Sequence, residues 1–485
     1  MRPLALLALL LPAMAGAQER PSEDEMFGKP AEQPAARPAP QPTQGDRAAS
    51  EAEMFGSAAS PAAQPPPPGG LVKKEQDDPL KLGGFVYLRL ASQGYEGTSF
   101  ADTPLTSPNL VDLYLDARPN DRVRAFTLGR MSWDPTAGGS SQSPTSLLGA
   151  SSSNAPRAVL DQLWLNFDVE RTVFVTAGKQ HVKWGTGKFW NPTDYLHPVK
   201  RDPLAVFDSR SGVTMVRAHV PWEKEGWNFY GVALLEDAAG GTARVNTLGK
   251  VGAGARAELV FGPAELGLDA LLQDGSRPRF GVDLSAGVWE LDLYGELAIR
   301  TTTDAPRFRE VDPALPSYLG RYARVTGSGF EPQLVLGGSW TKNYGSDQDS
   351  VTFGAEYFWN GFGYDDPEIY PYLLLQGGFT PSYAGRHYLG GFVSLPAPGS
   401  WNDTSFTLSA LGNLSDRSFT VRLDHSVLAL TYLRVETYVS AAGGAKGGEF
   451  RFQMGPQLVP GGGGFVTPEI APPSVGAGVA IRVSL

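Results

Sequence analysis

The chain has 485 residues, with 58 glycines, 40 prolines, no cysteine and a formal net charge of −10. The absence of cysteine excludes disulfides, thiolate metal sites and a lipid-modified N-terminal cysteine. The acidic balance argues against a nucleic-acid partner, because nucleic acids select basic protein faces.

Residues 1–17 predict a secretory signal peptide. Arg2 supplies the positive start, Leu4–Leu11 a short apolar core and Ala15–Ala17 a small-residue cleavage site. That core is too short to cross a bilayer as a helix, and no later stretch is apolar enough to do so. A membrane form of this protein would therefore have to be a β-barrel.

Residues 18–81 predict a disordered arm, because their Pro, Ala and Glu content cannot bury a core. The arm contains a repeat, SEDEMFG at 22–28 and SEAEMFG at 50–56, which matches at six of seven positions. Two copies of a short motif on one tether would raise the avidity for a periplasmic envelope protein. The alternative is a chance echo in low-complexity sequence. The expected partner-binding residues are Glu25, Met26, Phe27, Glu53, Met54 and Phe55.

Residues 82–485 alternate between apolar and polar side chains with a period of two, which is typical of β-strands. In WELDLYGELAIR, residues 289–300, the apolar face carries Trp289, Leu291, Leu293, Leu297 and Ile299. Several such runs are long enough to cross a bilayer as tilted strands. We expect an all-β fold, a transmembrane antiparallel up-and-down barrel of about 18 strands, preceded by the disordered periplasmic arm.

The connections between these runs support that fold. Long connections join odd-numbered runs to even-numbered ones, while most even-to-odd connections are tight. Outer-membrane barrels have short periplasmic turns and long outer loops, so both ends of the barrel should lie in the periplasm. The alternative is a secreted, soluble multi-sheet β protein, which has no reason to sort its loops in this way.

The connection at residues 186–210 is the first candidate site. A loop of this length without helix or strand signals is usually functional. We expect it to fold into the lumen and narrow it; the alternative is a structural cap at the rim. The residues assigned to this constriction are Trp184, Lys188, Trp190, Asn191, Asp194, Arg201, Asp202, Asp208 and Arg210.

A motif runs through this region: GKQHVKWG at 178–185, then WNPTD at 190–194 and RDPL at 201–204. It resembles a porin-like family of bacterial outer-membrane barrels. The resemblance covers about 35 residues and implies the fold and an inserted loop, but no particular substrate. The approximate strand number is also similar to that of alginate-export-type barrels, which implies polysaccharide as a second possible cargo.

A second candidate site is the polar lining of the lumen. The residues expected to face it are Asp112, Asp116, Lys183, Glu290, Asp292, Glu296, Arg300, Arg422, Asp424 and Arg434. Such mixed charges serve either structural pairing or ion selectivity. Tyr114 and Tyr294 on the same faces could stack on sugars or pack within the wall.

The sequence offers no catalytic motif, and we expect no enzyme activity, metal or cofactor. None of its five histidines lies in a nucleophile or zinc motif. The leading hypothesis is an outer-membrane channel, surrounded by lipid, for small solutes or polysaccharide. The alternative is a barrel that anchors a trans-envelope complex through the EMFG motifs.

Overall fold

The computed structural model describes residues 79–137, 154–208, 210–237, 245–300, 306–315, 320–325, 331–345, 349–456 and 469–485. The expected signal peptide and the arm with both EMFG motifs lie outside the described residues.

Eighteen long strands and the two-residue β2 (Leu105–Thr106) form a single nineteen-stranded sheet. The long strands are β1 (Leu80–Tyr95), β3 (Asn109–Asn120), β4 (Val123–Trp133), β5 (Arg157–Val169), β6 (Val173–Gln180), β7 (Val213–Trp222), β8 (Trp227–Leu234), β9 (Gly252–Phe261), β10 (Ala264–Leu272), β11 (Arg279–Val288), β12 (Leu291–Arg300), β15 (Glu331–Asn343), β16 (Ser350–Asn360), β17 (His387–Pro396), β18 (Thr404–Asn413), β19 (Ser418–Leu430), β20 (Leu433–Gly444) and β21 (Pro473–Ser484).

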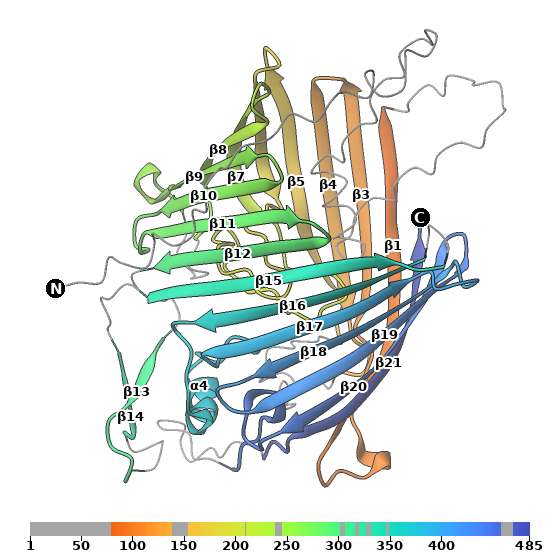
Figure 1. The fold of residues 1–485 in the computed structure, drawn as a ribbon, viewed down its shortest axis with the longest axis vertical. Coiled ribbons are helices and arrows are strands. Elements are labelled where there is room, and N and C mark those ends of the chain that lie inside the picture. Colours follow the sequence, from red (N-terminus) through yellow and green to blue (C-terminus); the bar gives the residue numbers. More distant parts are fainter. Residues whose placement is uncertain are drawn as a thin grey trace, which may run out of the picture. The chain divides into compact units, whose positions relative to one another are not determined.

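The sheet closes on itself. Each long strand pairs antiparallel with the next, and β21 pairs with β1 from Phe85↔Ser484 to Tyr95↔Pro473. Figure 1 shows β1, in orange, beside β21, in dark blue. Closure leaves no free strand edge, so neighbouring strands satisfy the backbone donors and acceptors around the whole barrel. The predicted barrel of about 18 strands is confirmed.

Loop length alternates around the barrel as predicted. Short turns such as 121–122 and 262–263 join even-numbered long strands to odd-numbered ones, whereas 134–156, 181–212 and 361–386 join odd to even. We call the two ends of the barrel the short-turn rim and the long-loop rim. Because the number of strands is even, both ends of the barrel chain lie at the short-turn rim.

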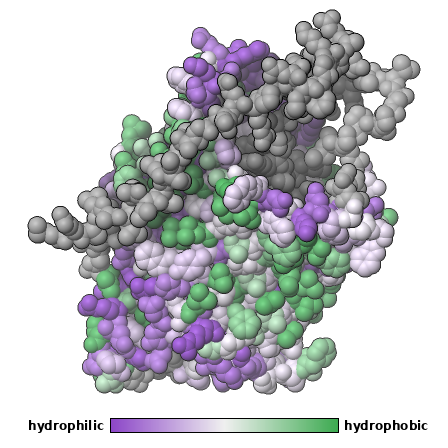
Figure 2. Space-filling model, in the orientation of Figure 1, coloured by the Kyte–Doolittle hydropathy of each residue, from purple (hydrophilic) through white to green (hydrophobic). Residues whose placement is uncertain are grey.

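Side chains alternate between the outer surface and the lumen. In β12, Leu291 and Leu293 are exposed on the outside, while Glu296 and Arg300 are buried inside. Large apolar side chains are likewise exposed along the other strands, and Figure 2 shows hydrophobic residues gathered across the middle of the visible face. The short-turn rim carries exposed aromatic residues, namely Trp222, Phe261, Trp289, Trp401 and Tyr432. Within the described part of the chain, no helix is long and apolar enough to cross a membrane.

The long-loop rim carries a small core of its own. Three long connections supply β13 (Phe308–Glu310), β14 (Tyr322–Arg324), η4 (Pro367–Ile369), α4 (Tyr370–Leu375) and η5 (Glu449–Arg451). Their buried side chains form one cluster, which we call the outer cap: Phe308, Tyr322, Ile369, Tyr370, Leu373, Ala384, Phe452, Met454 and Ile470. The loops at this rim are therefore packed against one another.

Candidate functional site: a loop inside the lumen

The segment at 181–212, which we call the constriction loop, follows β6 and turns into the lumen. Two glycines of the WGTG stretch permit the turn. Gly185 has a φ of +85°, and a Cβ there would lie 2.3 Å from Thr193 Oγ1. At Gly187, a Cβ would lie 1.9 Å from the carbonyl oxygen of Trp190. A larger residue at either position would break the fold of the loop.

Glu356, on the lumen side of β16, holds the tip of this loop. Its carboxylate accepts hydrogen bonds from the backbone amides of Lys188 (2.7 Å), Phe189 (3.2 Å) and Trp190 (2.7 Å). The Tyr294 hydroxyl donates to the same carboxylate at 2.8 Å. The side chain of Glu356 thus satisfies three successive amides that the loop's turn leaves without backbone partners.

Glu296 of β12 anchors the loop in the same way on a neighbouring strand. It accepts hydrogen bonds from the backbone amide of Gly187, and from the amide and hydroxyl of Thr193 at 3.3 and 2.9 Å. Glu296 and Glu356 are each only 1% exposed. Two wall carboxylates therefore fix the loop through its backbone, which makes the contact independent of most loop side chains.

Aromatic packing fills the space around the tip. Trp190 is fully buried, with its ring 5.6 Å from that of Phe358 and 5.4 Å from that of Tyr388. Its indole nitrogen donates to the Ser382 carbonyl at 2.9 Å, and Phe189 meets Phe392 edge to face. The tip is therefore a packed element of the far wall.

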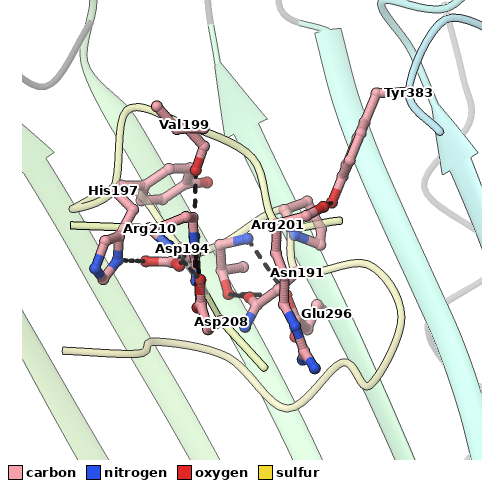
Figure 3. A network of polar contacts seen from close by, with 12 residues as sticks. Asn191, Asp194, His197, Val199, Arg201, Asp208, Arg210, Glu296 and Tyr383 are labelled. Atoms are coloured by element: carbon pink, nitrogen blue, oxygen red, sulfur yellow. Dashed lines mark hydrogen bonds and ion pairs between the residues drawn. The ribbon is translucent and has the colours of Figure 1, made fainter. Parts of the chain in front are cut away.

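A buried ion-pair network shapes the middle of the loop, as Figure 3 shows. Asp194 contacts Arg210 at 2.9 Å and His197 at 3.2 Å, and Arg210 also pairs with Asp208 at 2.7 Å. Burial pushes the pKa of Asp194 upward, but His197 and Arg210 outweigh burial and hold it well below its usual range. Asp194 is therefore an ionised anchor between two segments of the loop.

The loop touches several walls of the barrel. Tyr195 donates to the Phe280 carbonyl at 2.7 Å, and the Tyr383 hydroxyl donates to the Arg201 carbonyl at 3.1 Å. On its return, Phe207 packs against Tyr87 of β1, with ring centroids 5.2 Å apart. The chain thus crosses the lumen to β16 and β17 and comes back by way of β1.

Most residues assigned to the constriction lie in this arrangement. Trp184 is buried beside Leu271, and Lys188 Nζ lies 5.8 Å from the Tyr294 ring centroid. Asn191 accepts from the Thr193 hydroxyl at 3.4 Å. Asp202 is exposed and caps the amide of Leu204 at 3.0 Å instead of entering the network.

Several residues assigned to the lumen lie in ion pairs on its wall. Asp112 pairs with Arg130 at 2.8 Å, and Asp116 with Arg124 at 2.8 Å. Arg300 donates to the Pro192 carbonyl at 3.2 Å and thus supports the loop. On β19, Arg422 pairs with Asp424 at 2.6 Å, and on β20, Arg434 donates to Ser426 at 3.4 Å.

Three of the assigned lumen residues lie elsewhere. Glu290 occupies the exposed turn between β11 and β12, where it accepts from the Trp340 indole at 3.0 Å. Asp292 is exposed beside that turn, at the start of β12. Lys183 is exposed and outside any strand, because β6 ends at Gln180 where the chain turns inward, so strand alternation no longer sets its direction.

Sequence reasoning assigned no anchoring role to Glu356, Ser382 or Tyr388. The signal available for Glu356 was an acidic residue in the middle of a strand with no basic neighbour in the sequence, which calls for a distant donor. Of the two possible sugar-stacking residues, Tyr294 is buried against the loop, and Tyr114 has Phe126 stacked on it at 5.7 Å. In the described part of the chain, no group of three or more His, Asp or Glu side chains could hold a metal ion.

No family model matches the chain, and no curated protein matches it. Among solved structures, a point mutant of the Rh. blastica porin matches with a TM-score of 0.40 and 12% identity, covering 84% of this chain and 100% of the porin. OccAB1 of Acinetobacter baumannii matches with a TM-score of 0.47 and 10% identity, covering 84% and 96% respectively. The chain is thus similar to these barrels, at a level of overlap from which no function follows.

Proposed function

We propose that the chain is an outer-membrane channel through which small hydrophilic solutes diffuse, with the constriction loop setting the width of the path. The membrane assignment is supported by the barrel's own surface. Apolar side chains are exposed around the outside, and aromatic residues such as Trp289, which is 97% exposed, mark the short-turn rim. Exposed apolar surface on this scale needs lipid to cover it.

The observation that carries the channel assignment is the fixed position of the constriction loop across the lumen. A loop held by two buried carboxylates on the opposite wall restricts what can pass, while charged pairs such as Arg422–Asp424 line the wall beside it. Polar side chains facing a lumen make it wettable, which a conducting path requires.

Single-channel recording of the refolded protein in planar bilayers tests this function. We expect stable current steps that are proportional to voltage. Silence from both the intact chain and a variant lacking 188–207 would contradict the channel. Neutral polymers of graded size, added to the chamber, then separate solute passage from polysaccharide passage. Exclusion of all but the smallest polymers supports solutes, whereas entry of chains of several sugar lengths supports glycan export.

Partner binding through the EMFG motifs is a separate proposal, which rests on the sequence repeat alone. A peptide covering residues 18–80 should retain an envelope protein from a membrane extract. A matched peptide in which Met26, Phe27, Met54 and Phe55 are changed to serine should not. Equal retention by both peptides would remove the proposal.

A further inference from the structure

The constriction loop covers one side of the barrel. Trp184 packs with Leu271 of β10, Tyr195 bonds to β11, and the tip bonds to β12 and β16. The acidic side chains of β9–β11 are paired at this wall. Arg256 contacts Glu258 at 3.0 Å, Asp269 at 3.3 Å and Asp283 at 2.6 Å. A solute that passes beside the loop is therefore largely shielded from these carboxylates.

The opposite wall, formed by β19, β20, β21 and β1, has more arginines than acids. Two of its arginines are paired, Arg422 with Asp424 at 2.6 Å and Arg482 with Glu436 at 2.7 Å. The other two, Arg89 and Arg434, have hydroxyl partners. Arg89 donates to Tyr438 at 2.9 Å, and Arg434 donates to Ser426 at 3.4 Å.

Strand alternation places both arginines on the lumen side. Tyr87, two residues before Arg89, packs against the inserted Phe207. Val439 is exposed on the outer surface, which directs the Arg434 face of β20 inward. Among the residues that the structure describes, neither arginine has a carboxylate partner. A guanidinium held by hydroxyl groups alone keeps its full charge available to an anion.

The loop adds positive charge from its own side of the path. Residues 181–212 contain five Lys and Arg against three Asp, a net charge of +2 with histidine neutral, whereas the whole chain is at −10. Both sides of the path therefore carry the same sign, and a path lined by one sign favours the opposite ion.

We propose that the lumen selects anions, that Arg89 and Arg434 are the selectivity-determining residues of the wall, and that its solutes carry carboxylate or phosphate groups. This inference rests on the proposed channel function. The side chain of Arg89 reaches Tyr438 across β21, where Gly478 and Ala480 leave the space open. Arg434 lies opposite Arg482 in the strand register, nearer the short-turn rim. The two guanidiniums thus offer successive positions to an anion moving along the wall.

The reversal potential across a KCl gradient tests the proposal on the full chain in planar bilayers. We expect the intact protein to pass chloride in preference to potassium, and the preference to grow as salt is lowered, because screening weakens. The R89Q/R434Q variant should lose at least about half of the chloride-to-potassium permeability ratio. The control R309Q/R324Q removes the same charge from exposed positions of β13 and β14, outside the barrel wall, and should leave the ratio unchanged.

The outcomes separate the two proposals. Current without anion preference in the intact protein, or an unchanged ratio in R89Q/R434Q, overturns the anion assignment and leaves the channel standing. Silence overturns the channel and this inference together. If R89Q/R434Q fails to fold, inorganic phosphate added to the intact protein decides instead: it should reduce the chloride current by competing for the arginines, and no reduction counts against the proposal. R434K, which keeps the charge, should retain the selectivity.

Discussion

At the scale of single residues, Glu356 carries the largest share of the loop's attachment. Its carboxylate serves three backbone amides and one tyrosine hydroxyl at a buried position. Each buried donor left without an acceptor costs about 1–3 kcal/mol. The loop therefore depends on a single side chain that lies 166 residues away from its tip in the sequence.

We expect E356A to free the loop tip, raise the mean conductance and make the current noisy. E356Q keeps one carbonyl acceptor and should fall between E356A and the intact protein. E225A, which removes an exposed acid from a turn at the short-turn rim, serves as the control and should conduct normally. Single-channel traces with the quiet baseline of the intact protein in E356A would contradict the anchoring role.

Glu449 is the second residue with a defined consequence, because it lies buried within the outer cap. It accepts hydrogen bonds from Tyr388 (2.5 Å), Asn413 (2.9 Å) and the backbone amides of Tyr383 and Ala384 (3.2 Å each). Burial raises the pKa of Glu449 to about 7 from 4.5, and nearby Asp416 adds to the rise, whereas the donated hydrogen bonds oppose it. The packed cap therefore favours the protonated form of this carboxyl group.

Linkage gives the sign of the pH effect. The stabilisation from the raised pKa is fully present below about pH 4.5 and is lost as the pH rises through about 7, amounting to about 3 kcal/mol. A nitroxide attached at Q453C, unique because the chain has no cysteine, should become more mobile in its EPR spectrum between pH 5 and 9. E449Q, which cannot ionise, should show no such change. An equal response in both proteins would contradict the assignment.

At the scale of elements, the constriction loop is a separable segment of the barrel. Its two ends join neighbouring strands, β6 and β7, which pair directly from Gln180↔Val213 downward. Its removal therefore leaves every strand pairing intact.

Replacement of 188–207 by a short Gly-Ser linker should increase the conductance by about twofold or more, because the lumen of a barrel of this strand number is wide when empty. Shortening 98–103, an exposed stretch at the same rim that includes η1 (Phe100–Asp102), is the matched control and should leave the conductance unchanged. Unchanged conductance after the loop replacement would mean that the loop does not limit flow.

The elements also show how far sequence reasoning reaches. The strands could be predicted because each pairs with its neighbour in sequence and carries its own alternation, as in β12. The predicted entry of the loop into the lumen followed from its length and composition. Its partners could not be predicted, because Glu356 and Tyr388 reach it only through barrel closure, and Lys183 was misplaced because alternation was extended past the end of β6.

At the scale of the whole molecule, closure of β21 on β1 controls stability. A closed barrel has no edge strand from which to unravel, so its unfolding should be cooperative and slow. We expect the purified protein to require detergent and to migrate faster on a gel without heating than after boiling. Free solubility of the refolded chain without detergent, with identical migration in both samples, would contradict a membrane barrel.

The even number of long strands also decides which segments of the chain a cell would display. The amide of Leu485 bonds to the Gly84 carbonyl at 2.9 Å, so this end is held at the short-turn rim. An epitope joined there would stay hidden from antibodies applied to intact cells. The same epitope inserted at 312–315, beyond the β13 strand on the opposite side, would be labelled at once.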